Sequence, residues 1–329
     1  MVSTSVRIWR QNRIMANIRE VARRAGVGVG TVSRALNGSG YVAEETKERI
    51  QAIARELDYN PNELARNLFR NRTGIVGVVV PDMENPFFSK LLKYMEIELY
   101  KNSYKALICN TIEISSREQD FIDMLKANVV DGIITGAHSL RDDAYHNLNK
   151  PVVAMDRNLG SDIPVIHSDH KAGGRMAAEL LLEAGCRNVL QFGGSFRVHT
   201  PSNDRHMEFC RVMEENGAAV NTIELAWNMM GYDYYRNVMN QYMDIYRNID
   251  GVFTTDIVAL YCMDMAKQRN IPVPEKLHIV GYDAIDVTRL FAPNLTSIAQ
   301  NIPLLAKTCV DTMMDLLDVF RFCHLNRGY

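Results

Sequence analysis

Polar side chains follow three apolar runs of strand length, at positions where they could bind a ligand. Asp82 and Asn85 come after the first of these runs, Asp156 and Arg157 after another, and Asp283 after the last. Carboxylates accept pairs of hydroxyl groups and Arg and Asn donate to them, so the set suits a hydroxyl-rich small molecule. A single Asp after a strand is more often the N-cap of the next helix, but the five together favour a binding site.

The chain lacks the residue patterns of the common catalytic and cofactor sites. It has no nucleophile elbow, metal triad or P-loop, and Asp156 and Asp283 have no evident base or nucleophile as a partner. The six cysteines are far apart with no CxxC pair, which argues against zinc and against a disulfide framework. Gly26, Gly28 and Gly30 follow a predicted helix rather than a strand, so they are not a dinucleotide-binding loop. We expect no catalytic residue, no metal and no cofactor, and an enzyme on this scaffold is the weaker alternative.

The region after Thr73 supplies the scaffold, because apolar runs and amphipathic stretches alternate along it. Strands are predicted at 75–80, 106–109, 132–135, 152–155, 188–192, 223–225, 251–254 and 278–280. Helices are predicted at 88–101, 117–127, 172–184, 204–216, 234–246, 258–269 and 308–317. Such alternation indicates parallel sheets covered by helices on both faces. We expect two doubly wound α/β lobes, lobe 1 at about 73–169 plus 300–318 and lobe 2 at about 170–299, with a crevice at the carboxyl ends of the strands.

Residues 16–57 predict three short helices. The apolar residues of 18–25 recur at helical spacing, and this helix ends at Gly26. A second helix is predicted at 27–37 and a third at 44–57. Two helices joined by a tight glycine turn are typical of a helix-turn-helix, whose second helix enters the major groove of DNA. Arg34 on that helix suits bidentate pairing with guanine, whereas a small helical bundle with exposed arginines is the alternative.

Charge is distributed unevenly along the chain. Residues 1–72 carry thirteen Lys and Arg against seven Asp and Glu, a balance of +6, although the whole chain has a net charge of −2. A basic N-terminal region followed by an acidic remainder is expected when the N-terminal region binds the phosphate backbone of a nucleic acid. A solvated basic face would give the same count, so the charge agrees with DNA binding without deciding it.

The run from Ile18 to Leu68 resembles the DNA-binding head of the lac repressor family. It contains VA-x-x-AGV, TVSR-x-LN and Y-x-PN-x-x-AR-x-L. The resemblance implies that Val29, Gly30 and Arg34 select operator bases. It implies backbone or hinge contacts for the other DNA-binding residues, which are Thr31, Ser33, Asn37, Tyr59, Asn62, Ala65 and Leu68. Gly28 departs from the family, which usually has a capping Ser at this position.

The segment 61–72 is expected to be a separate hinge. Pro61 fits the first turn of a helix, and the helix-compatible residues after it are too few to persist alone. In the family this segment folds only on the operator, where Leu68 and its mate from the second subunit wedge into the minor groove. A simple linker is the alternative.

The remainder resembles the family's periplasmic-binding-protein-like core over 73–318, through VPDMENPFF, PVVAMDRN, SDHKAGG and GYD. The resemblance places effector contacts on residues of both lobes, namely Phe87, Asp156, Arg205, Thr255, Asp283 and Gln300. Glu208 stands where the family usually has glycine, and we expect it to add bulk and charge behind the pocket wall. Blocks such as MLKANVVDGIITGAHSL look most like the sucrose operon repressor branch, which implies sucrose, fructose or a phosphorylated derivative.

The two ends of the chain are atypical. We interpret 1–14 as a disordered extension before a head at 15–60, and 319–329 as a tail that looks truncated. A missing strand would leave a sheet edge unpaired and the protein poorly soluble. No apolar run reaches the ~18–20 residues that span a membrane, and 1–14 is a poor signal peptide.

Together these features predict a cytoplasmic homodimer that binds double-stranded operator DNA and is released from it by a sugar effector, with no membrane association. Two alternatives keep the fold. One is a regulator whose effector is a purine or another sugar acting as corepressor. The other is a cytosolic sugar-binding protein, which the presence of the predicted head argues against.

Overall fold

The structure is a computed structural model that describes residues 17–38, 40–59, 72–112, 117–137, 142–145, 148–196, 200–226, 229 and 231–325. The chain divides into two compact units, one ending at Thr73 and the other starting at Gly74. The predicted DNA-binding residues Asn62, Ala65 and Leu68 lie outside the described residues, as do the extension at 1–14 and residues 326–329.

The first unit contains the three predicted helices, α1 (Ile18–Ala25), α2 (Val29–Asn37) and α3 (Glu44–Glu56). Its core consists of small and β-branched apolar residues, namely Val21, Ala22, Ala25, Val32, Ala35, Ile50 and Ala54. Asn17 caps α1 by accepting a hydrogen bond from the Glu20 amide at 3.0 Å. Gly28 precedes α2 without a side-chain cap, so α2 begins at Val29 rather than at Val27.

Lobe 1 is built on a parallel sheet with the strand order β2-β1-β3-β4-β5. The strands are β1 (Ile75–Val80), β2 (Lys105–Asn110), β3 (Gly132–Thr135), β4 (Val152–Met155) and β5 (Val165–Ile166). The helices are α5 (Pro86–Lys101), α6 (Arg117–Lys126), the 3-10 helix η1 (Asp142–Tyr145) and α12 (Ile302–Leu325). The central strands are buried on both faces, which explains why they read as continuous apolar runs.

Lobe 2 repeats this architecture with the order β10-β9-β8-β6-β7, again parallel. The strands are β6 (Asn188–Gly193), β7 (Ala219–Glu224), β8 (Gly251–Phe253), β9 (His278–Asp283) and β10 (Thr296–Ala299). The helices are α7 (His170–Glu183), the 3-10 helix η2 (Pro201–Asn203), α8 (Asp204–Glu215), α9 (Tyr232–Ile245), α10 (Asp256–Gln268) and α11 (Asp286–Phe291). The two-lobed α/β fold class is therefore confirmed.

The chain passes from lobe 1 to lobe 2 between β5 and α7 and returns between β10 and α12. β5, β10 and α11 were not predicted, because β5 has two residues, α11 has six, and only Ile298 of β10 is fully buried. Elements this short carry too little periodicity to be recognised.

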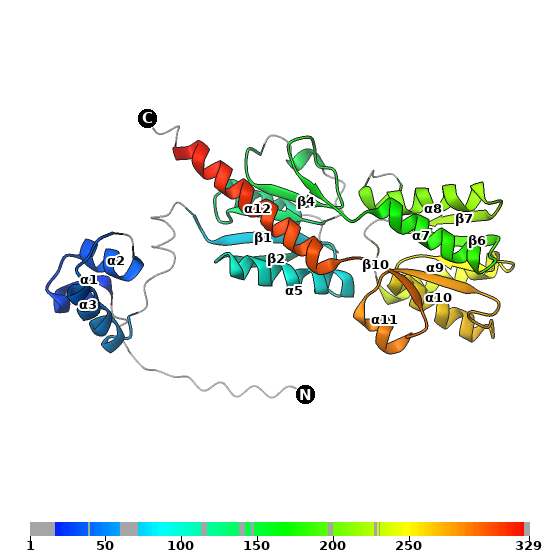
Figure 1. Ribbon diagram of the computed structural model, residues 1–329, viewed down its shortest axis with the longest axis horizontal. Coiled ribbons are helices and arrows are strands. Elements are labelled where there is room, and N and C mark those ends of the chain that lie inside the picture. The colour runs from blue at the N-terminus through cyan, green and yellow to red at the C-terminus, as the bar shows by residue number, and fades with distance from the viewer. Residues whose placement is uncertain are drawn as a thin grey trace. The chain divides into compact units, whose positions relative to one another are not determined.

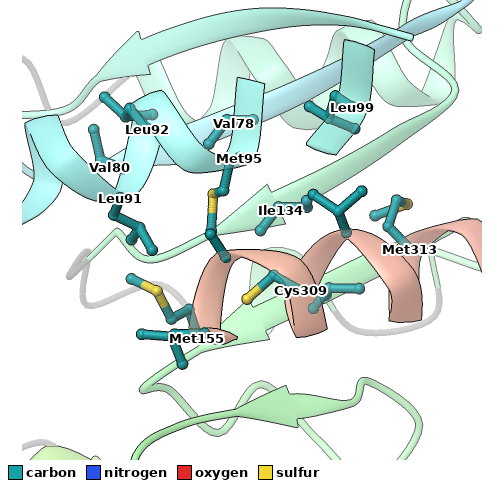
Figure 2. Close-up of a cluster of buried hydrophobic side chains, with 14 of the residues drawn as sticks. Val78, Val80, Leu91, Leu92, Met95, Leu99, Ile134, Met155, Cys309 and Met313 are labelled. Atoms are coloured by element: carbon teal, nitrogen blue, oxygen red, sulfur yellow. The ribbon is translucent and has the colours of Figure 1, made fainter. Parts of the chain in front are cut away.

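α12, drawn in red in Figure 1, completes the core of lobe 1 beside α5. Its buried residues recur at helical spacing from Ile302 to Leu317, whereas the sequence predicted a helix only from Thr308. Figure 2 shows Cys309 and Met313 of α12 in the same cluster as Met95 of α5 and Ile134 of β3. The helix continues to Leu325, so part of the expected atypical tail is helical.

Two substitutions on α12 test this packing. Met313 is fully buried and Val319 is 57% exposed. We expect Met313→Ala to lower the free energy of unfolding by about 2–5 kcal/mol, because it leaves a cavity in the lobe 1 core. Val319→Ala should change it by less than about 0.5 kcal/mol. Denaturant unfolding of the full chain measures both, and equal effects of the two variants would contradict the packing.

Candidate functional site

The outer face of α2 carries the predicted base-reading side chains. Val29, Gly30 and Arg34 are exposed, while Thr31 and Ser33 are half-buried. Two arginines of α1 are paired, Arg23 with Glu20 at 2.5 Å and Arg24 with Glu56 at 2.7 Å. Arg34 makes no ion pair with any described residue.

The hydrogen bonds of α2 leave Arg34 available to a partner. Its guanidinium approaches the Thr31 hydroxyl at 3.5 Å, a separation at the limit of a hydrogen bond. Asn37 bonds Ser33 at 3.2 Å along the same helix, and Tyr59 is half-buried. The exposed guanidinium gives this face the geometry for base or phosphate contact.

A cavity of about 180 Å³ lies in the second unit, where side chains of the two lobes meet. All six predicted effector-contact residues line it: Phe87, Asp156, Arg205, Thr255, Asp283 and Gln300. Its other polar lining residues include Ser195, Thr200, Ser202 and Asn203, and its apolar ones include Phe88, Met155, Met229 and Tyr235. The carboxyl ends of parallel strands from both sheets converge here.

Lobe 1 contributes an aromatic wall and a carboxylate. Asn85 and Pro86 start α5 and bring Phe87 to the cavity, where its ring meets that of Phe88 edge-on at 5.2 Å between centroids. Asp156 directly follows β4 in the left-handed region, with φ of 52°. Its side chain is almost fully buried and accepts a hydrogen bond from His170 Nε2 at 2.7 Å.

Lobe 2 contributes the cation and a second carboxylate. Arg205 lies in the first turn of α8, and its guanidinium carbon is 4.4 Å from the centroid of the Tyr282 ring. Asp283 ends β9 with φ of 105°. Gln300 donates to Asp283 Oδ1 at 2.8 Å and accepts from the Ser168 hydroxyl at 2.6 Å, so its amide is held in one orientation.

Removal from water dominates the electrostatics of this site. Burial raises the pKa of Asp283 to about 7, although the nearby Arg205 charge and the Gln300 hydrogen bond both act to lower it. Burial also raises the pKa of Tyr282 to about 12, so this tyrosine keeps its proton at neutral pH. The pKa of His206 is well below its ordinary value, because of burial and the neighbouring Arg205 charge, and the ring is therefore neutral.

Three polar side chains near the predicted site have other roles. Arg157 is buried away from the cavity, where it bonds Glu118 at 3.2 Å and the Ala137 carbonyl at 2.8 Å. Asp82 accepts from the Glu84 amide at 2.9 Å and does not line the cavity. Asn85 lines the cavity, but its oxygen caps α5 through the Phe87 amide at 3.0 Å. The capping alternative thus holds for Asn85, whereas Asp82 closes a turn before α5 and caps no described helix.

Glu208 does not distort the backbone of α8. Its carboxylate pairs with Arg175 of α7 at 2.8 Å and with Arg211 at 2.7 Å. The hydrogen bond from Arg211 is the main cause that lowers the pKa of Glu208 to about 2, and the hydrogen bond from Arg175 and the charges of both arginines act in the same direction. The side chain that replaces the usual glycine therefore joins α7 and α8 at the surface.

Metal binding and membrane insertion find no support in the described chain. No group of three or more His, Cys, Asp or Glu side chains in it could hold a metal ion. None of its helices combines the length and the apolar character needed to cross a membrane.

Known proteins of the same architecture match both units. The family model for bacterial regulatory proteins of the lacI family matches residues 17–62, and the model for a periplasmic binding protein-like domain matches 178–321. The sucrose operon repressor of Streptococcus mutans is 36% identical over 93% of this chain and 94% of its own length. The chain belongs to the lacI family.

Other lacI family proteins agree with this assignment. The ribose operon repressor of Halalkalibacterium halodurans is 36% identical over 88% of this chain and 86% of its own length. A crystal structure of the lac repressor dimer, bound to operator and the anti-inducer ONPF, has a TM-score of 0.79. At 21% identity over 93% of both chains, that structure supports the fold alone.

The structure places three residues behind the cavity-lining side chains that sequence reasoning did not identify, and none of the three lines the cavity itself. Ser168 and His170 hold Gln300 and Asp156, respectively, and Tyr282 lies beneath Arg205. Ser168 and His170 fall in the SDHKAGG block, so the block could have suggested them. Nothing in the sequence, however, shows which side chains they meet.

The raised pKa of Asp283 has a consequence for stability. The pKa is about 7 in the folded chain against an ordinary value of 3.8. The folded state therefore binds the proton more tightly, and ionisation of Asp283 costs stability increasingly as the pH rises from about 4 to 7. We expect Asp283→Asn to stabilise the protein by roughly 1–2 kcal/mol at pH 8 and by less at pH 5.

Denaturant unfolding at both pH values measures this difference. Asp286→Asn is the control, since Lys90 lowers the pKa of the exposed Asp286 carboxylate and its removal should not stabilise the chain. A loss of stability in Asp283→Asn at pH 8 would contradict the account of this carboxylate.

Proposed function

We propose that this chain is a transcriptional repressor of a sugar-utilisation operon, with sucrose as the leading candidate for that sugar. It binds a palindromic operator as a homodimer in the cytoplasm and is released when a sugar or sugar phosphate occupies the cavity. The chain has no catalytic role in this proposal. Its family relatives include sucrose and ribose operon repressors.

The observation that carries the sugar assignment is the pair of carboxylates in one cavity. Asp156 from lobe 1 and Asp283 from lobe 2 line it together with Arg205 and Gln300. Each carboxylate has one oxygen bonded within the protein and a second that can accept from a sugar hydroxyl. Guanidinium and amide groups donate to sugar oxygens. The ring of Phe87 supplies an apolar surface for the C–H face of a sugar.

The charge of the cavity bears on phosphorylation of the effector. Among the described lining residues, Arg205 is the one with a permanent positive charge, and two carboxylates accompany it. Arg157, next to Asp156 in sequence, is already paired with Glu118. This balance favours an unphosphorylated or singly phosphorylated sugar.

The DNA-binding half of the proposal depends on α2 and the hinge. The exposed face of α2 presents Val29, Gly30 and Arg34 to the major groove, with Thr31, Ser33, Asn37 and Tyr59 as backbone contacts. Two heads of a dimer would meet two half-sites one helical turn apart. Asn62 adds a further backbone contact and Ala65 lies in the hinge that binds DNA, while Leu68 wedges into the minor groove.

The switch is a shift between two lobe arrangements. A ligand can move such an equilibrium only by binding one arrangement more tightly, and a cavity walled by both lobes meets this requirement. Contacts between the lobes, such as the ion pair of Lys90 in α5 with Asp286 in α11 at 2.8 Å, would alter as the lobes rotate. Rotation would separate the two hinges of the dimer, and each head would then bind its half-site alone.

Operator release is the direct test. A palindromic DNA selected from a randomised pool by the full-length chain serves as the operator, and fluorescence anisotropy reports binding. We expect sucrose, fructose or one of their phosphates to weaken binding by about tenfold or more, a coupling of ~1–3 kcal/mol. Ribose and purines serve as competing effectors. Tighter operator binding with any of these ligands would establish the corepressor alternative instead.

Two substitutions should separate the two activities. Leu68→Ala should weaken operator binding, because the minor-groove wedge is lost, and leave sugar binding intact. Arg205→Gln should raise the Kd for the sugar by about 10- to 100-fold, the cost of losing charged hydrogen bonds, and leave operator binding without sugar intact. Anisotropy and calorimetry measure the two affinities, and loss of both activities in either variant would refute the division of labour.

A further inference from the structure

We infer that His170 is a positioning residue for the effector site. Together with Tyr282 it fixes the cavity carboxylate of lobe 1, Asp156, relative to the cavity cation of lobe 2, Arg205. This inference rests on the proposed effector function of the cavity. It assigns a role to two buried side chains that do not line the cavity themselves.

A continuous chain of contacts joins the two cavity residues. His170 Nε2 lies 2.7 Å from Asp156 Oδ1, and His170 Nδ1 lies 3.1 Å from the Tyr282 hydroxyl. The guanidinium of Arg205 then lies over the Tyr282 ring. His170 and Tyr282 are each 2% exposed, so water does not compete for these bonds.

The chemistry of the partners determines how the protons are arranged. An ionised carboxylate only accepts, so the ring nitrogen facing Asp156 must carry a proton. Because the raised pKa of Tyr282 keeps its hydroxyl protonated, that hydroxyl can donate to His170 Nδ1. One oxygen of Asp156 is thus held by His170, and the other is left for a ligand hydroxyl.

Two adjacent glycines of α7 show that the chain of contacts is closely packed. A Cβ on Gly173 would lie 2.6 Å from the Tyr282 hydroxyl, and a Cβ on Gly174 would lie 2.1 Å from the Arg205 carbonyl oxygen. Neither position has room for a side chain. The first turn of α7 therefore contacts Asp156 through His170, Tyr282 through Gly173 and Arg205 through Gly174.

Indirect control of affinity follows from this arrangement. Small displacements of groups that bind a ligand cost affinity even when the groups themselves are unchanged. Without His170, Asp156 loses its partner and Tyr282 loses the acceptor that orients it. Loss of His170 should therefore lower ligand affinity by displacing a binding group in each lobe, Asp156 in lobe 1 and Arg205 in lobe 2.

Calorimetry on the full-length protein, with sucrose, fructose and ribose as probes, tests the inference. His170→Leu and Tyr282→Phe should each raise the Kd of the bound sugar by about tenfold or more, the effect of losing a hydrogen bond to a charged or oriented group. His170→Gln, which keeps one donor and one acceptor, should recover most of the affinity. Operator affinity without sugar should stay within about twofold, which shows that the variants are folded.

Tyr145→Phe is the matched control. Tyr145 is also 2% exposed and bonds a carboxylate, Glu118, at 2.7 Å, but it does not line the cavity. Removal of the Tyr145 hydroxyl should lower the free energy of unfolding without changing sugar affinity. A purely structural role for His170 and Tyr282 would give the same result as Tyr145→Phe and would overturn the inference.

Nitrogen NMR of the protein labelled at histidine provides a second readout that needs no sugar. We expect His170 signals that show a proton on Nε2, the nitrogen facing Asp156, with the Nδ1 signal shifting in Tyr282→Phe. A ring protonated at Nδ1 alone, or no shift, would overturn the inference while leaving the proposed function intact. If no probe sugar binds the wild type, the proposed function fails and this inference fails with it.

Discussion

The withdrawal of two carboxylates from bulk water at the ends of parallel strands is the constraint on which the rest of the site depends. Taking an ionised carboxylate out of water costs several kcal/mol unless hydrogen bonds or a cation compensate for it. Asp156 has His170 as its compensating partner, and Asp283 has Gln300 and the Arg205 charge. Both aspartates also lie at positive φ, a backbone conformation that surrounding structure must hold in place.

The compensating partners stand where the chain crosses between the lobes. Ser168 lies between β5 and α7, His170 is the first residue of α7, and Gln300 lies between β10 and α12. The bonds that stabilise the buried carboxylates therefore also join the two lobes. For this reason ligand binding and lobe arrangement are expected to be coupled, because a ligand that engages the carboxylates acts on the same groups that hold the crossing segments.

The sequence predicted well those features that depend on local pattern. β1, β3 and β4 have the predicted bounds, because strands buried on both faces read as continuous apolar runs. The three helices of the head followed from apolar spacing and glycine stops. The family resemblance, rather than any pattern, singled out Arg205, Thr255 and Gln300 as partners of Asp156 and Asp283.

The remaining features depend on contacts that local patterns do not encode. His170 and Tyr282 are far apart in sequence, and only the packing of α7 on β9 makes them hydrogen-bond partners. The orientation of Arg157 also depends on such contacts. It follows Asp156, which lies beyond the end of β4 at positive φ, and it bonds Glu118 and the Ala137 carbonyl.

The central claim is that the sugar in the cavity and the operator on the head oppose each other. Linkage requires that each ligand change the affinity of the other by the same factor. Calorimetric titration of the sugar into the free protein and into its operator complex measures this factor. The account predicts that sugar binds the operator complex more weakly, by the factor with which it weakens operator binding. Equal sugar affinity in the two titrations would contradict it.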